Sequence, residues 1–282
     1  MNKFFKKYLP FTKGVFLESL TYRVRFIFWL TFEILYLVIS FFLWKGVYQS
    51  HSNYQAIPFN EVVIGSYTFQ MMIMYVFFEK IVGSLTNLSI EGYISDEIKD
   101  GSISMRLIKP ISYRTQLFFQ GLGNEMVEFV FFALPFTIIF IGASFIMKFE
   151  IMFTPYSIIM FIVSIILGGF INYLISFLFG MILFLTLNSF GMFQFKTAIE
   201  RILSGSLIPI SLFPTWLKVI CDIMPFAQTR YIPICFILGQ YNNDKIQGLF
   251  TILIQLIWVI ILLILSSLIW RKATKKIVVQ GG

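Results

Sequence analysis

The side chains that could do chemistry in this chain are concentrated in one short segment. Between Glu91 and Arg114 the sequence reads EGYISDEIKDGSISMRLIKPISYR, which holds four acidic and four basic residues. The residues alone leave two interpretations open. The segment is either a docking surface for another protein or a solvated connector whose charges only maintain the topology of its neighbours.

The other reactive residue types do not form a catalytic or metal-binding pattern. His51 is the only histidine, and Cys221 and Cys235 lie outside any CxxC or metal-ligand spacing. The stretch GASF at 142–145 superficially resembles an intramembrane serine-protease motif, but the sole histidine lies in an expected outer loop. No HExxH motif and no GxxxxGK[ST] phosphate-binding loop occurs. We therefore expect that the chain is not an enzyme.

The composition assigns the chain to a membrane. Of its 282 residues, 58% are hydrophobic and 13% are charged, with a mean hydropathy of +0.83. This is more apolar surface than a soluble globular protein of this length can cover. The net charge of +8 does not indicate nucleic-acid binding, because the basic residues flank apolar runs and form no solvated patch.

The apolar runs predict an all-α, polytopic membrane protein. A spanning helix needs roughly 20 mostly apolar residues, with about 17 as the lower limit. Six stretches of the sequence meet this requirement, namely 26–44, 62–78, 126–147, 157–188, 197–213 and 247–270. If the N-terminus is cytoplasmic, 17 of the 22 Lys and Arg residues lie inside and 5 lie outside. This asymmetry predicts that both termini are cytoplasmic.

Three segments outside the predicted spans have features of their own. Residues 1–25 mix aromatic residues with lysines, as in an interfacial helix drawn to anionic lipid, and Pro10 should interrupt that helix. Residues 214–240 contain two apolar pieces too short to cross, which predicts an outer re-entrant hairpin before the last helix. Just before it, Gly205 and Pro209 can break or kink the fifth helix, and a simple kinked span is the alternative.

The 79–115 loop is expected to be cytoplasmic and to contain a short helix. Ser95 is a candidate N-cap, and Asp96 and Glu97 would occupy the first turn, where the helix dipole favours negative charge. Gly101 marks a break within the segment, and Pro110 marks its end. Mixed charge combined with apolar residues suits a helix that docks on another protein.

Three stretches resemble one family of transporters. DEIKDGSISMRLIKPIS at 96–112 resembles the stretch after the second span in permease subunits of the ABC type-2 exporter superfamily. YRVRF at 22–26 and FPTWLKVICDIMPFAQTRYIPICFILG at 213–239 resemble two further motifs of the six-span members, which are encoded with a separate ATP-binding subunit. The last motif is the most specific, although Met224 stands where leucine is usual.

The resemblance implies the transmembrane half of an ATP-driven exporter in the bacterial cytoplasmic membrane, forming a single transmembrane domain over residues 1–282. The 79–115 loop would carry a coupling helix that seats in a cleft of the ATP-binding subunit, which would be present in two copies and would bind ATP and Mg²⁺. A second six-span permease, identical or similar, would complete the complex. The implied coupling residues are Asp96, Glu97, Ile98, Lys99, Asp100, Gly101, Arg106 and Lys109.

The cargo is not determined by these motifs. Sparse polar groups along the spans favour a hydrophobic or amphipathic molecule, such as a drug, peptide, antibiotic or lipid. The alternative function is a secondary transporter or channel that does not depend on ATP. Copurification of a soluble P-loop ATPase would distinguish the two.

Polar residues inside the spans are candidates for the pathway or for contacts between helices, because an ionisable group in lipid is costly unless paired or wet. Glu33 is the deepest acid and either meets a cationic cargo or forms an interhelical hydrogen bond. Glu125 and Glu128 lie one turn apart, and we expect them to pair with basic residues at the interface, with contact to the cargo as the alternative. Gln70 and Gln255 should link helices.

Overall fold

The computed structural model describes residues 3–149, 153–183 and 189–280. Within these ranges the chain is helical almost throughout, apart from one two-stranded ribbon. The all-α class predicted from composition is confirmed. Four helices are long and apolar enough to cross a membrane, namely Val24–Gln55, Tyr113–Met147, Pro155–Ile182 and Lys245–Thr274.

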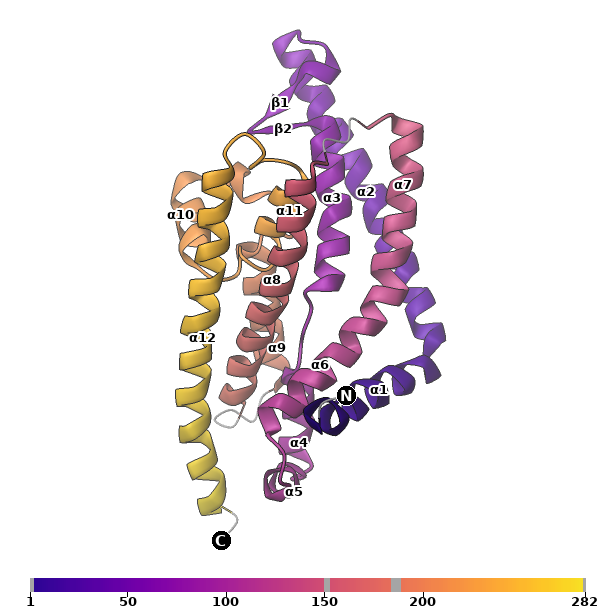
Figure 1. The fold of residues 1–282 in the computed structure, drawn as a ribbon. Coiled ribbons are helices and arrows are strands. Elements are labelled where there is room, and N and C mark those ends of the chain that lie inside the picture. Colours follow the sequence, from indigo (N-terminus) through magenta and orange to yellow (C-terminus); the bar gives the residue numbers. More distant parts are fainter. Residues whose placement is uncertain (1–2, 150–152, 184–188, 281–282) are drawn as a thin grey trace.

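Helix α1 (Lys3–Thr21) lies across one end of the molecule and packs against α6, and a bend at Tyr22 leads into α2 (Arg23–Gln55) (Figure 1). The expectation that Pro10 would interrupt α1 is wrong. Tyr8 and Val15 on either side of the proline are buried. This packing compensates for the backbone hydrogen bond that proline cannot donate.

A short ribbon replaces the start of the second predicted span. After the 3-10 turn η1 (Phe59–Glu61), strands β1 (Val63–Ile64) and β2 (Tyr67–Thr68) pair antiparallel. Thr68 then caps α3 (Phe69–Leu85) by accepting a hydrogen bond from the Met71 amide. The helix therefore begins seven residues later than the predicted 62–78 and ends seven later, and it has 17 residues.

The charged segment forms two helices rather than one. Helix α4 (Glu91–Lys99) already begins at Glu91, so the prediction that Ser95 caps it is wrong, and Ser95 is buried inside the helix. Gly101 adopts a left-handed φ of 72°, which breaks the chain before α5 (Ile103–Ile108). Glycine adopts this conformation without the steric cost other residues carry.

The helix at the third predicted span is longer than predicted and contains a π-helical turn. It comprises α6 (Tyr113–Glu128), the π turn η2 (Phe129–Ala133) and α7 (Leu134–Met147). Figure 1 shows that it bends between α6 and α7. The predicted span began at 126, because the polar residues of α6 interrupt the apolar run on which the prediction was based.

The second half of the chain begins with α8 (Pro155–Ile182), which matches the predicted 157–188 span except that 184–188 lie outside the described residues. Helix α9 (Ser189–Leu203) ends ten residues before the predicted 213, where Gly205 takes a φ of 77°. A 3-10 turn, η3 (Ile210–Leu212), and two short helices, α10 (Thr215–Ile223) and α11 (Tyr231–Ile237), follow. Helix α12 (Lys245–Gln280) closes the fold.

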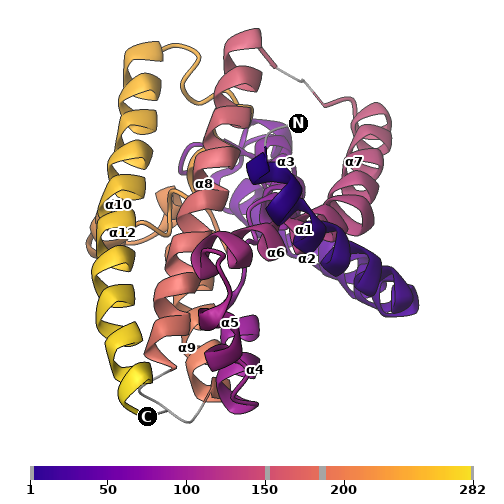
Figure 2. The same ribbon diagram turned by 60° about the horizontal axis from the view of Figure 1, so that its bottom comes forward.

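The helices form two packed groups. Helix α12 packs beside α8, which also contacts α11 and α4, whereas α2, α6 and α7 gather around α3 on the other side (Figures 1 and 2). Contacts of α3 with α11 and α8 join the groups. Figure 1 places α4, α5, α1 and the last turns of α12 toward one end of the molecule, called here the α4–α5 end, and the ribbon at the opposite end.

Candidate functional site

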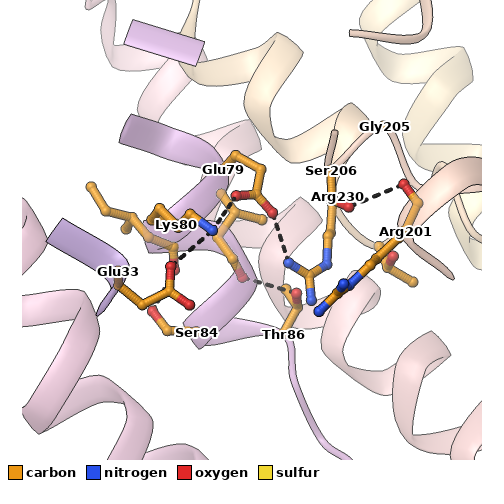
Figure 3. A network of polar contacts seen from close by, with 12 residues as sticks. Glu33, Glu79, Lys80, Ser84, Thr86, Arg201, Gly205, Ser206 and Arg230 are labelled. Atoms are coloured by element: carbon orange, nitrogen blue, oxygen red, sulfur yellow. Dashed lines mark hydrogen bonds and ion pairs between the residues drawn. The ribbon is translucent and has the colours of Figure 1, made fainter. Parts of the chain in front are cut away.

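A chain of ion pairs crosses the boundary between the two helix groups. Lys80 of α3 lies 2.9 Å from Glu33 of α2 and 3.4 Å from its neighbour Glu79. On its other side, Glu79 accepts a hydrogen bond from Arg230, which directly precedes α11, at 2.9 Å. Figure 3 shows Lys80 between the two carboxylates and Arg230 beyond Glu79. Three separate segments thus meet through one network.

Local structure explains how Arg230 reaches α3. Gly83 lies one helical turn beyond Glu79, and a Cβ atom added there would overlap the Arg230 guanidinium. The absence of a side chain at Gly83 therefore leaves room for the cation. Because Glu79 is buried, the arginine also satisfies a carboxylate that would otherwise be costly in this environment.

A second ionic cluster lies between α4, α8 and α9. The ammonium group of Lys196 is 2.8 Å from Glu91 of α4, 3.2 Å from Glu200 one turn along α9, and 2.9 Å from the Ser176 hydroxyl of α8. Lys196 is only 2% exposed. The cluster therefore joins the start of the charged segment, at Glu91, to α9 and α8.

The two clusters border one polar cavity, called here the polar hollow, with a volume of about 800 Å³. Four acidic and four basic side chains line it, together with aromatic residues of α2. The charged residues are Glu33, Glu79, Glu91, Glu200, Lys80, Lys196, Arg201 and Arg230. The sequence-based view that polar lining is sparse is wrong for this region, because the charges come from segments far apart in the chain.

A smaller cavity of about 220 Å³, called here the acidic lobe, adjoins the hollow on the side of α6. The two share Glu33, Glu79, Lys80 and Arg230. The acidic lobe adds Glu128 and the aromatic rings of Phe132 and Phe136 to the lining.

A third cavity is apolar, unlike the other two. About 250 Å³ between α2, α3 and α7 is lined only by apolar side chains, including Leu37, Phe41 and Phe77. It can accept a hydrocarbon chain, but it offers no group that would orient a polar ligand.

The candidate polar residues from the sequence have different surroundings. Glu33 of α2 is paired with Lys80 of α3. Of the two roles considered for Glu33, this is the contact between helices. Gln255 of α12 donates to the Ser164 hydroxyl and the Gln228 carbonyl, both at 2.8 Å, and links helices as predicted. The side-chain amide nitrogen of Gln70 is buried without a hydrogen-bond partner among the described residues.

The structure shows no ion pair of Glu125 or Glu128 within the part of the chain that it describes. Among the described residues, neither carboxylate has a basic group within 4.0 Å, and both oxygens of Glu125 are buried without a partner. Two of the basic residues nearby, Lys80 and Arg230, are already engaged, since they pair with Glu33 and Glu79.

The charged segment has an inner face and an outer face. Glu97 is buried, pairs with Arg106 at 3.0 Å and accepts a hydrogen bond from the Tyr113 hydroxyl at 2.7 Å. Glu97, one of the implied coupling residues, therefore lies on the inner face, where its carboxylate joins α4, α5 and α6. The half-buried Ile98 and Arg106 lie at the margin between the two faces.

The outer face of α4 and α5 is a mixture of charged and apolar side chains. Asp96, Lys99, Asp100, Gly101 and Lys109 are exposed, and so are Met105 at 69% and Ile108 at 81%. The Asp100 carboxylate accepts hydrogen bonds from Ser102, and these hold the pKa of Asp100 below its usual value. The bond from the Ser102 backbone amide has the larger effect and the bond from its hydroxyl the smaller. That carboxylate stabilises the turn between the two helices.

Sequence reasoning missed six charged residues of the two clusters: Glu79, Lys80, Glu91, Lys196, Glu200 and Arg230. One signal was available. Glu79 and Lys80 are adjacent charges directly after an apolar run, and they were assigned to the loop because the second span was placed seven residues too early. No local pattern pairs Arg230 with a residue 151 positions away.

Comparison with known proteins identifies a family. A family profile described as ABC-2 family transporter protein matches residues 34–281. No curated protein and no solved structure matches the chain.

Proposed function

The chain belongs to the ABC-2 transporter family, and from this membership and the site geometry we propose that it couples ATP hydrolysis in a partner subunit to the export of an amphipathic molecule. The family and the long apolar helices make it a multi-pass protein of the cell membrane. ABC-2 permeases are membrane components that work with an ATP-binding subunit.

The proposed topology has six crossings with both termini in the cytoplasm. The four long helices provide four crossings, α3 provides one, and α9 with the segment that follows provides the sixth. The α4–α5 end would then be cytoplasmic, in agreement with the excess of Lys and Arg there. Helices α10 and α11, of 9 and 7 residues, are too short to cross and would form the outer re-entrant hairpin.

The outer face of α4 and α5 is the proposed docking surface for the ATP-binding subunit. Its exposed charges would orient the ATP-binding subunit as it docks, and Met105 and Ile108 would provide apolar contact area. The inner face is fixed to the membrane helices by Glu97 and by the Glu91–Lys196 pair. A rigid displacement of α4 on nucleotide binding would therefore move α9, which lines the polar hollow.

The charged polar hollow is the single observation that carries the cargo proposal. A wholly hydrophobic cargo would make no use of eight charged side chains, whereas an amphipathic molecule could place its polar group there and its apolar part against the aromatic residues of α2. Two ATP-binding subunits and a second six-span permease, identical or similar, are proposed to complete the exporter.

Copurification tests the partner. The tagged chain, expressed with the ATP-binding proteins of its host, should retain a P-loop ATPase whose hydrolysis the chain stimulates. An Asp96→Lys/Lys99→Glu variant should lose this stimulation, since both residues are exposed on the proposed docking face. The matched control is Glu61→Lys/Lys148→Glu, which inverts two exposed charges outside α4 and α5 and should leave stimulation unchanged.

A different result would favour the alternative function. If the purified chain transports cargo in vesicles without nucleotide and without an ATPase, it is a secondary transporter or channel. Normal stimulation in the Asp96→Lys/Lys99→Glu variant would contradict the proposed docking face alone.

A further inference from the structure

The acidic lobe carries more negative than positive charge. Three acidic residues line it, Glu33, Glu79 and Glu128, against two basic residues, Lys80 and Arg230. The bases are paired with the first two acids, which leaves the Glu128 carboxylate without an ion pair among the described residues.

Among the described residues, no neighbouring basic group forms an ion pair with Glu128. Glu125 lies one helical turn before Glu128 and adds a second carboxylate, whose oxygens are buried without a partner. Arg25 and Arg230 are near enough to attract the Glu128 carboxylate, but neither lies within 4.0 Å of it in the described part of the chain. Glu128 is half-buried, and a carboxylate held away from water is costly unless it is protonated or has a cation beside it, so this region can accept a bound cation.

The walls of the lobe are suited to an organic cation. Trp29, Phe132 and Phe136 line it, and the negative face of an aromatic ring attracts a cation within about 6 Å of its centroid. A small hydrated metal ion gains less from such rings than a substituted ammonium group, which also loses less hydration. No group of three or more His, Cys, Asp or Glu side chains suited to a metal occurs in the described part of the chain.

The backbone at this position is also irregular. Glu128 is the last residue before the π turn, and Phe132 lies within that turn. Single π-helical turns inside α-helices are frequent at functional sites. Here the turn places a carboxylate and an aromatic ring on the wall of the same cavity.

We infer that the acidic lobe binds the cationic group of an amphipathic cargo, with Glu128 as its counter-ion and Trp29, Phe132 and Phe136 as its walls. The inference rests on the proposed export function and narrows its cargo to organic cations. The apolar part of such a molecule would extend into the adjoining polar hollow along Phe32 and Tyr36 of α2.

A matched pair of soluble probes tests this inference on the full chain in lipid nanodiscs, without nucleotide. Benzyltrimethylammonium is a permanent cation, and benzenesulfonate is an anion with the same ring. Saturation-transfer NMR should detect binding of the cation only. Glu128→Gln keeps the shape but removes the charge, and it should weaken cation binding about tenfold. Glu61→Gln, an exposed carboxylate outside the lobe, is the matched control and should bind as the unaltered chain does.

Equal binding of the two probes, or unchanged cation binding in a folded Glu128→Gln variant, would overturn the inference. If that variant does not fold, Trp29→Leu replaces a side chain that is 58% exposed and should still weaken cation binding several-fold. Unchanged binding in Trp29→Leu would equally overturn it. The proposed function is tested apart from this, because nucleotide-dependent export without cation binding refutes only the inference, and nucleotide-independent export refutes the function.

Discussion

The Glu79 carboxylate and the Arg230 guanidinium lie 2.9 Å apart and join α3 to the start of α11. The pair connects the two helix groups at the edge of the polar hollow (Figure 3). Glu79 is also 3.4 Å from Lys80, so its single carboxylate contacts two cations.

Removing one member of this pair should destabilise the protein. Arg230→Met leaves Glu79 buried with one cation instead of two, and breaking a buried ion pair typically costs about 3 kcal/mol or more. We expect a clearly lower Tm in nanodiscs for Arg230→Met. The double variant Glu79→Gln/Arg230→Met should recover part of the loss, because no uncompensated charge remains. Equal Tm values for the single variant and the unaltered chain would show that the pair does not stabilise the fold.

Lys196 should be needed for coupling between the charged segment and the hollow. Lys196→Met leaves Glu91 and Glu200 without their common cation, so α4 is no longer tied to α9. Copurification of the ATPase should persist, since the exposed docking face is intact, whereas cargo export should fall by about tenfold or more. Lys218→Met, on α10 and in no ion pair among the described residues, is the control. Full export by Lys196→Met would show that the ionic link between α4 and α9 is not needed for transport.

Gly180 allows α4 to approach α8. A Cβ atom at Gly180 would overlap the terminal methyl group of Ile94, and the further methyl groups of a valine would crowd the contact between α8 and α4. Gly180→Val should therefore reduce ATPase stimulation several-fold, with a destabilisation of about 1–3 kcal/mol from overpacking. Gly142→Val is the control, because nothing lies within 4 Å of a Cβ at that position. A normal stimulated ATPase rate in Gly180→Val would mean that this contact does not set the position of α4.

The turn between α4 and α5 should loosen in acid. Hydrogen bonds from Ser102 lower the pKa of Asp100, so the carboxylate stabilises the turn above the ordinary aspartate value of about 3.9. This stabilisation is lost as pH falls through the lower folded-state pKa. The NMR shift of the Ser102 amide should titrate with a midpoint below about 3.9. Asp100→Asn should abolish that titration, and a midpoint at or above the ordinary value would contradict the assignment.

The membrane class and the position of the charged segment followed from the sequence alone. Apolar runs determine burial in lipid regardless of how helices pack, so composition sufficed to predict an all-α membrane protein. The motifs around Gly101 and from 213 to 239 indicated the family that the profile match confirms. Helix ends were less accessible, because the β1–β2 ribbon delays α3 and the packing of α1 keeps Pro10 within a helix.

The polar site was decided by tertiary structure. Glu33, Glu79 and Arg230 come from separate segments, and no periodicity within any one helix records that they meet. For the same reason the sequence did not indicate that Arg106 and Tyr113 hold Glu97 on the inner face of α4. Local patterns report how each helix divides between lipid, water and protein. Only packing brings charges from different helices within 4 Å, where Coulomb attraction offsets the loss of hydration.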